Sequence, residues 1–175
     1  MTDLHRRTHL RAAAWVPDDD PHRDWAAAAN LAADWIWQRS EIEGVSPVLV
    51  TNAQEPRGFG IDALDEIARA GGRTTPQSRS RPDPAPVLVY VPYEGSLQCA
   101  MDQARGFSLV AVETKLFSLA EWAAGAEAIN LLTGKTSSSA IPDDVRDDLD
   151  SVMFDGGRNG WTGPDEKAYA HRHLA

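Results

Sequence analysis

Three residues form the sharpest catalytic pattern in the sequence. Glu113 and Lys115 flank a threonine at the end of an apolar run, and Asp102 lies upstream of them. Alternate side chains of a strand point to the same face, so this carboxylate and ammonium would lie together. One hypothesis is therefore a metal-dependent hydrolase or nuclease, in which the acids hold Mg²⁺ and Lys115 orients the attacking water. Glu94 is a further acid for the same site.

Two observations favour a simpler interpretation of this pattern. Asp102 falls within a helical pattern and not on a strand that precedes Glu113. A motif of three residues also recurs by chance, and an ion pair at a strand end produces it equally well. The nuclease hypothesis is therefore an alternative to the binding function considered next.

A second group of polar side chains follows the short apolar runs at 47–52, 86–91 and 108–113. In open α/β sheets, ligands bind beyond the carboxyl ends of the strands, where loops and helix starts meet. Polar loop ends and helix caps also occur there without any ligand. The ligand-binding residues predicted at this edge are Asn52, Tyr93, Glu94, Ser96 and Glu113.

The positions of histidine, cysteine and glycine do not indicate a further catalytic or phosphate-binding site. All five histidines lie at positions 5–22 or 171–173, far in sequence from the apolar runs. Cys99 is predicted to be inert, because it falls opposite the apolar stripe of its helix and no histidine is near it. Neither common glycine-rich phosphate loop is present: position 129, where a P-loop ending at Gly134 needs glycine, is Ile129. We predict no metal site outside the nuclease hypothesis.

The elements that must position these residues alternate between strand and helix over residues 47–134. The three apolar runs are rich in β-branched residues and read as strands covered on both faces, which is typical of parallel sheets. Helices are predicted from Asp62 to Gly71 and around the apolar face of 97–104. A third begins at the capping box Ser118-Leu-Ala-Glu121 and runs past Ile129 to Gly134.

The flanking regions are predicted to be mainly helical. Residues 2–14 and 24–39 read as helices, and a fourth strand is available at 12–16 or 152–154, although neither run is a clear strand. The segment 73–86, with four prolines, is too long for a minimal connection and is either a functional loop or, as we favour, a flexible insertion. Together these patterns predict a single α/β domain over 1–175, a small Rossmann-like three-layer unit with a short, mostly parallel sheet. It comprises an N-terminal helical extension (1–46), an α/β core (47–134) and a C-terminal acidic helix, glycine-rich loop and tail (135–175).

Composition narrows the partners. The chain has 175 residues and a net charge of −9, spread evenly along it, without a basic stripe that would follow a phosphate backbone. No apolar run is long enough to span a membrane, and a single cysteine is typical of the reducing cytoplasm. Nucleic acid and membranes are therefore disfavoured as partners, and a cytoplasmic location is expected.

The first hypothesis is thus a cytoplasmic binding or interaction module. It would use the carboxyl ends of its strands for a small ligand, or surfaces that carry some of its six tryptophans for a protein partner. A further alternative is an acidic interaction or inhibitor protein that meets a basic partner. Such a protein could imitate the charge of nucleic acid, which requires acids concentrated on one surface. The even spread of the charge argues against that alternative.

Overall fold

The computed structural model describes residues 9–53 and 58–138. The chain divides into a unit of residues 1–139 and a unit of residues 140–175. The predicted acidic helix after Pro142, the possible strand at 152–154 and the glycine-rich loop lie outside the described residues.

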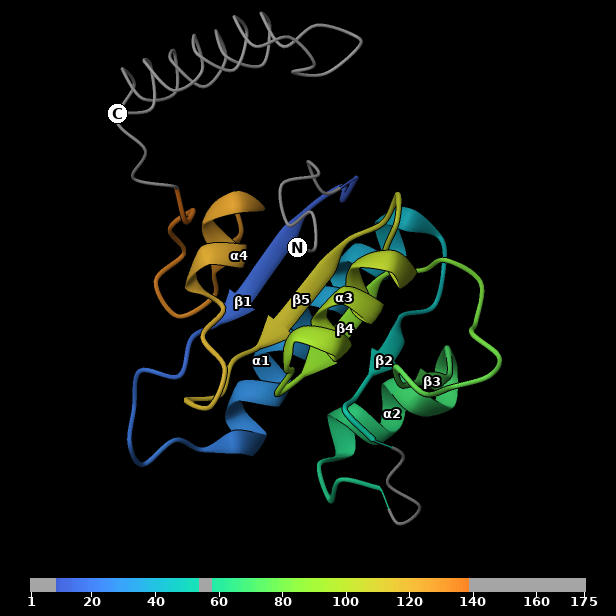
Figure 1. Ribbon diagram of the computed structural model, residues 1–175, viewed down its shortest axis with the longest axis horizontal. Coiled ribbons are helices and arrows are strands. Elements are labelled where there is room, and N and C mark those ends of the chain that lie inside the picture. The colour runs from blue at the N-terminus through green and yellow to red at the C-terminus, as the bar shows by residue number, and fades with distance from the viewer. Residues whose placement is uncertain (1–8, 54–57, 139–175) are drawn as a thin grey trace, which may run out of the picture. The chain divides into compact units, whose positions relative to one another are not determined.

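A parallel β-sheet forms the centre of the first unit (Figure 1). Its strands in chain order are β1 (Ala13–Val16), β2 (Val48–Val50), β3 (Arg73–Thr74), β4 (Val87–Tyr90), β5 (Leu109–Val112) and β6 (Ile129–Asn130). Within the described residues, these six strands lie in the order β3-β2-β4-β5-β1-β6, and every pairing is parallel. The three apolar runs in the middle of the chain are strands β2, β4 and β5, as predicted.

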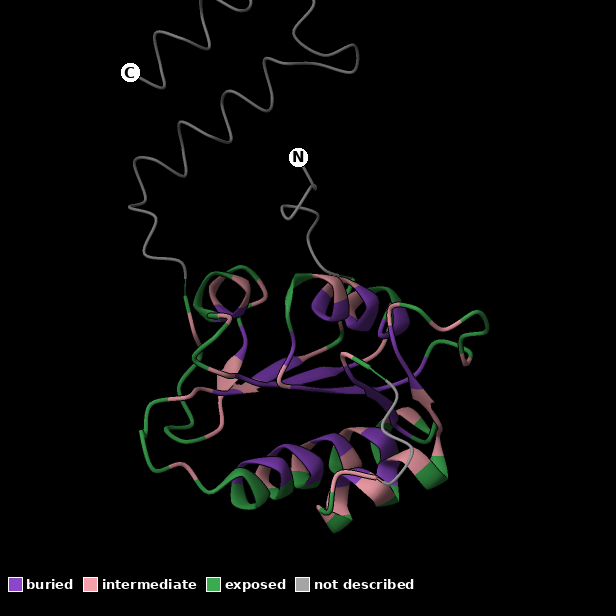
Figure 2. Cartoon of the chain, turned by 60° about the horizontal axis from the view of Figure 1, so that its bottom comes forward, coloured by how far each residue is buried: buried purple, intermediate pink, exposed green. Residues whose placement is uncertain are grey.

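Helices cover both faces of this sheet (Figure 2). They are α1 (Trp25–Glu43), α2 (Asp62–Ala70), α3 (Glu94–Gln103) and α4 (Ala120–Gly125). Leu88 and Val110 pack with the buried residues of α1 and α2, whereas Val89 and Leu109 pack with those of α3. Because successive strand residues enter opposite hydrophobic layers, the strands are apolar throughout. The described residues therefore form a Rossmann-like three-layer unit, which confirms the predicted fold class.

The N-terminal segment departs from its predicted helix. The described residues before Ala13 are not helical, and Ala13–Val16 is strand β1, between β5 and β6. Ala14 is completely buried there and pairs with Val110 and Ile129. Alanine favours helices, but a central position that is buried on both faces outweighs that preference. The sheet therefore extends into the region predicted to be a helical extension.

The helix predicted from Ser118 to Gly134 is also wrong. α4 is only six residues long, and its N-cap is Leu119, with no side-chain cap. The chain leaves the helix after Gly125, and Glu127 adopts a positive φ of 51°. Ile129 then pairs with β1, so the sheet takes the residue that the helical pattern had placed on α4.

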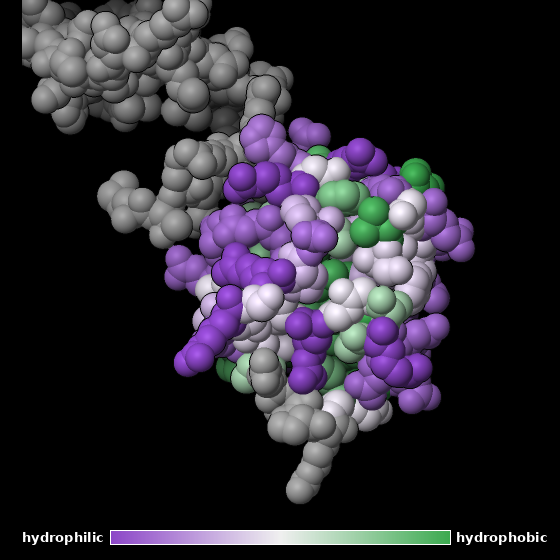
Figure 3. Space-filling view, turned by 90° about the vertical axis from the view of Figure 1, so that its right-hand side faces the viewer, coloured by the Kyte–Doolittle hydropathy of each residue, from purple (hydrophilic) through white to green (hydrophobic). Residues whose placement is uncertain are grey.

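The proline-rich segment 73–86 begins with a strand and is anchored to the rest of the unit. Arg73–Thr74 forms β3, beside β2. Further along, the Gln103 side-chain amide donates hydrogen bonds to the carbonyls of Asp83 (2.6 Å) and Pro82 (3.1 Å). Figure 3 shows this side of the molecule, where mainly hydrophilic side chains surround a few apolar ones. The segment is therefore anchored at both ends.

Candidate ligand-binding site

The topology creates two crevices at the carboxyl edge of the sheet. The helices that follow the neighbouring strands β2 and β4, α2 and α3, lie on opposite faces of the sheet. The same holds for the neighbours β5 and β1, which are followed by α4 and α1. Beyond the ends of such strands, the two connecting segments turn to opposite faces of the sheet. Open α/β sheets bind ligands in the space between these segments.

The crevice between β5 and β1 is closed by the protein's own polar groups. The Glu113 carboxylate accepts hydrogen bonds from the backbone N–H groups of Asp18 and Leu119, both at 2.7 Å. The Arg23 guanidinium donates to the carbonyls of Val16 (3.2 Å) and Glu113 (3.1 Å). Glu113, 8% exposed, thus joins the ends of β1 and β5 to the start of α4 and is not directed at a ligand. We call Asp18, Arg23 and Glu113 the strand-end clamp.

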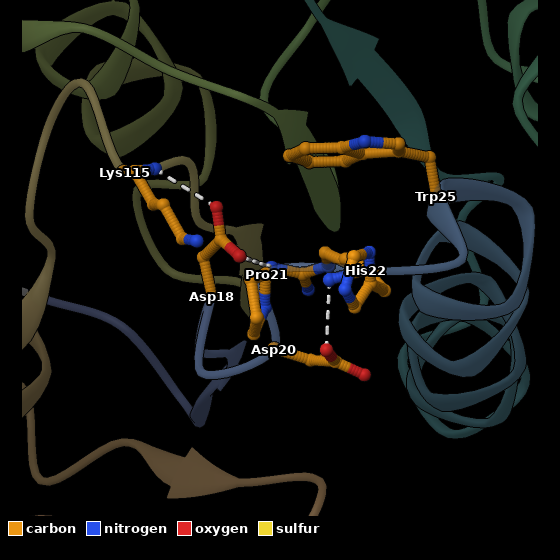
Figure 4. A pocket seen from close by; sticks show the side chains of 7 residues that line it. Asp18, Asp20, Pro21, His22, Trp25 and Lys115 are labelled. Atoms are coloured by element: carbon orange, nitrogen blue, oxygen red, sulfur yellow. Dashed lines mark hydrogen bonds and ion pairs between the residues drawn. The ribbon is translucent and has the colours of Figure 1, made fainter.

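Asp18 completes the clamp and borders a charged hollow. Its carboxylate accepts a hydrogen bond from the backbone N–H of Lys115 (2.9 Å) and lies 3.7 Å from the Arg23 guanidinium. Outside the clamp is a hollow of about 330 Å³, drawn in Figure 4. It is lined by Asp18, Asp20, Pro21, His22, Arg23, Trp25 and Lys115.

The crevice between β2 and β4 is open and aromatic. A pocket of about 510 Å³ lies there and extends over the carboxyl end of β5; its size is one that small-molecule sites usually have. It is lined by Trp25, Asn52, Tyr90, Val91, Pro92, Tyr93, Thr114, Leu116 and Phe117. Four of these side chains are aromatic, and none carries a formal charge at pH 7. Trp25 also lines the charged hollow, so it separates the two spaces.

A hydrogen-bond network around Asn52 builds one wall of this aromatic pocket. The Asn52 amide nitrogen donates to the Val91 carbonyl (2.9 Å), and its oxygen accepts from the Ser96 hydroxyl (2.6 Å). The Ser96 hydroxyl in turn accepts from the backbone N–H of Tyr93 (2.9 Å). Ser96 is completely buried, so it supports the pocket from behind. This network fixes the end of β2 relative to the start of α3.

Val91 is strained at the point where β4 enters the pocket. Its φ is +43°, a conformation that is rare for a β-branched residue and costs about 1–3 kcal/mol. Its N–H donates to the Val112 carbonyl (3.0 Å), while Asn52 holds its carbonyl. Strain that the surroundings enforce in this way is concentrated at functional sites.

Trp25 and Tyr90 form two walls of the pocket at nearly right angles. Their ring centroids are 6.5 Å apart and their planes meet at 80°. The Arg23 guanidinium lies 5.0 Å from the centre of the Trp25 ring, which fixes the indole from the other space. Burial raises the pKa of the Tyr90 hydroxyl, and the charge of Arg23 partly opposes that effect.

The structure therefore brings together only part of the predicted ligand-binding set. Asn52 and Tyr93 line the aromatic pocket, and Ser96 lies behind it. Glu94 is exposed on the first turn of α3 and does not line the pocket, while Glu113 belongs to the clamp.

Several pocket residues were not predicted. Trp25 was not among the predicted ligand-binding residues; it is the first residue of α1 and 37% exposed. Leu116, 95% exposed, and Phe117 belong to a turn that the Thr114–Phe117 bridge closes. The available signal was position, because all of these residues follow a strand at the carboxyl edge of the sheet.

The nuclease set is not assembled. Asp102 lies near the end of α3, where it is close to Arg81 and Arg105, both at 3.9 Å. Because α3 returns the chain to the start of β5, Asp102 lies toward the amino edge, whereas Glu113 and Lys115 follow the carboxyl end of β5. Among the described residues there is no group of three or more histidine, cysteine or acidic side chains that could hold a metal ion.

Cys99 lies in the core between α3 and the sheet, 2% exposed, and not on the outer face of its helix as predicted. Burial raises the pKa of its thiol; Arg81 lowers it, and Asp102 contributes a further increase. A buried thiol with a raised pKa is a poor nucleophile, which agrees with the predicted lack of reactivity.

Comparisons with protein-family models, curated proteins and solved structures give no match for this chain. Its class is thus defined by the fold, a Rossmann-like α/β unit. The described part of the chain contains no helix that combines the length and the apolarity needed to cross a bilayer.

Proposed function

We propose that this protein is a small-molecule binding module whose site is the aromatic pocket between β2 and β4. The observation that carries the proposal is the coincidence of an open pocket of about 510 Å³ with the point where neighbouring strands diverge. The neighbouring crevice, between β5 and β1, is filled by the strand-end clamp.

The construction of the pocket wall supports the same proposal. Asn52 uses both ends of its amide to hold Val91 and Ser96 in place, and Val91 is kept in a strained conformation. A loop that only connected β4 to α3 would not need this strain. Preorganised walls reduce the entropy that a ligand loses on binding.

The alternative site, a tryptophan-bearing surface for a protein partner, would also lie at the aromatic pocket. Of the tryptophans in residues 9–53 and 58–138, only Trp25 is among the large exposed apolar residues. Trp15, by contrast, is partly buried and its indole N–H donates to the Ser137 hydroxyl (3.0 Å). We favour a small ligand because the exposed indole borders a pocket. The single cysteine fits a cytoplasmic protein.

The test is a thermal-shift screen of the full chain against nucleosides, aromatic amino acids and small organic cations. We expect at least one class to raise the melting temperature in a concentration-dependent way. The shift should be lost in Tyr93→Ala, whose side chain lines the pocket and is 39% exposed. Ile42→Ser, at the far end of α1 and 71% exposed, is the matched control and should keep the shift. Absence of any shift, or equal loss in both variants, would overturn the proposal.

A further inference from the structure

We infer that the aromatic pocket receives a quaternary ammonium group, the trimethylated cationic head of a small molecule or side chain. This inference rests on the proposed binding function and specifies its ligand class. Three properties of the pocket lead to it: the shape of its walls, the charges around it and the absence of carboxylates from its lining.

The walls form a corner and not a slot. Trp25 and Tyr90 meet at 80°, and Phe59 packs against the far side of the cluster at 68° to Tyr90. No parallel pair of rings occurs among the aromatic contacts of the described residues. A flat heterocycle is best held between parallel rings, whereas a rounded group fits where ring planes converge at right angles. Rounded cations such as trimethylammonium are attracted by several aromatic faces at once.

An acidic residue already stands at the start of each helix beside the pocket. Two helices start at the pocket, and free N–H groups at a helix start would normally attract an anion. At α1 the Asp24 carboxylate already accepts from the Ala27 N–H (3.0 Å), and at α3 Glu94 occupies the first turn. Neither lysine nor arginine lines the pocket. Arg23, whose guanidinium lies 5.0 Å from the centre of the Trp25 ring, is beside the Asp18 carboxylate (3.7 Å) in the charged hollow. A phosphate or carboxylate would therefore find no positively charged side chain in the lining, whereas the aromatic faces attract a cation.

The lining distinguishes a methylated ammonium from a bare one. An –NH₃⁺ group loses its hydration on entry and needs about three acceptors to replace it. The Asn52 oxygen is already bonded to Ser96 and no carboxylate lines the pocket, so the side-chain acceptors that remain are the uncharged hydroxyls of Tyr90, Tyr93 and Thr114. Methyl groups remove that requirement and spread the charge over an apolar surface, which aromatic rings accommodate.

The test is isothermal titration calorimetry of the full chain with three related compounds. Choline carries the methylated cation, 3,3-dimethylbutan-1-ol has the same shape without charge, and ethanolamine has the charge without the methyl groups. We expect choline to bind at least about tenfold more tightly than either of the others. Trp25→Leu, which keeps apolar bulk but removes the ring, should abolish that preference, whereas Ile42→Ser should preserve it.

The outcomes separate this inference from the function on which it rests. Equal binding of choline and 3,3-dimethylbutan-1-ol, or stronger binding of ethanolamine, overturns the cation assignment and leaves a binding pocket. Binding of a nucleoside in the thermal-shift screen, without binding of choline, also overturns it, in favour of a flat ligand. No heat with any of the three compounds overturns the cation assignment, whereas the binding function is overturned only if the thermal-shift screen is negative as well. If choline binds, comparison with a short peptide containing trimethyl-lysine shows whether a free molecule or a protein side chain supplies the group.

Discussion

Replacement of Glu113 by glutamine should destabilise the protein strongly, although the side chain keeps its size. The carboxylate accepts two backbone hydrogen bonds of 2.7 Å, from Asp18 and Leu119, in a position that is 8% exposed. Bonds to a charged acceptor contribute about 1.5–3 kcal/mol each. Glutamine can accept only one of them with its oxygen, and its NH₂ group then opposes the other N–H.

The magnitude follows from these two changes. Weakening one bond costs about 1 kcal/mol, and leaving the other N–H without an acceptor costs about 2–3 kcal/mol. We therefore expect the free energy of unfolding to fall by about 3–4 kcal/mol, and the melting temperature by roughly 10 °C. This loss is a large part of the roughly 5–15 kcal/mol by which a typical domain is stable.

The assay is urea unfolding followed by far-ultraviolet circular dichroism, with Glu41→Gln as the matched control. Glu41 is exposed on α1, so its substitution should change the free energy of unfolding by less than about 0.5 kcal/mol. A loss below about 1 kcal/mol for Glu113→Gln, similar to the control, would refute the clamp. If choline binding disappeared while stability was unchanged, Glu113 would be a ligand contact, as the sequence predicted.

Three further changes test other parts of the structure. Gly71→Ala should cost about 2–3 kcal/mol, because the new Cβ would lie 2.1 Å from the Pro47 carbonyl oxygen; Gly125→Ala, where space is open, should be neutral or stabilise by up to about 1 kcal/mol, as chemical denaturation will show. Asn52→Ala should cost about 2 kcal/mol through its two lost hydrogen bonds and also abolish ligand-induced thermal shifts; retained shifts would remove this residue from the site. Cys99 should react with iodoacetamide only after urea unfolding, and stability should fall as the pH rises above the ordinary thiol pKa of 9.0 and through the raised folded value; rapid labelling of the native protein would contradict its burial.

The sequence predicted the parts of the fold that depend on local patterns. Strands β2, β4 and β5 are continuous apolar runs with β-branched residues, and these identify buried parallel strands without further information. β1 matches the possible strand at 12–16, but its two alanines favour a helix and the run is not a clear strand. Only its central place between β5 and β6 makes it a strand, and that place is a property of the whole sheet.

The candidate site was predicted to a similar extent. Asn52 and Tyr93 follow β2 and β4 directly, so the rule for the carboxyl edge found them. Trp25 reaches the pocket because the segment after β1 places the start of α1 beside Tyr90 of β4, which is separated from β1 by β5. The role of Glu113 was missed for the same reason, since Asp18 is brought beside it by the β1–β5 pairing.

The place of β1 in the sheet also determines when the sheet can be completed during synthesis. Asp18 and Glu113 are 95 positions apart in the chain, and β1 pairs with β5 and β6, which are made long after it. Until β5 emerges from the ribosome, β1 has neither of its neighbours and its two edges are open to other strands. Such long-range pairing folds slowly, because the intervening chain must be ordered first. β1, made before the other five described strands, is therefore among the last of them to be secured, and ribosome-bound chains that end before residue 109 should expose it to proteases and chaperones.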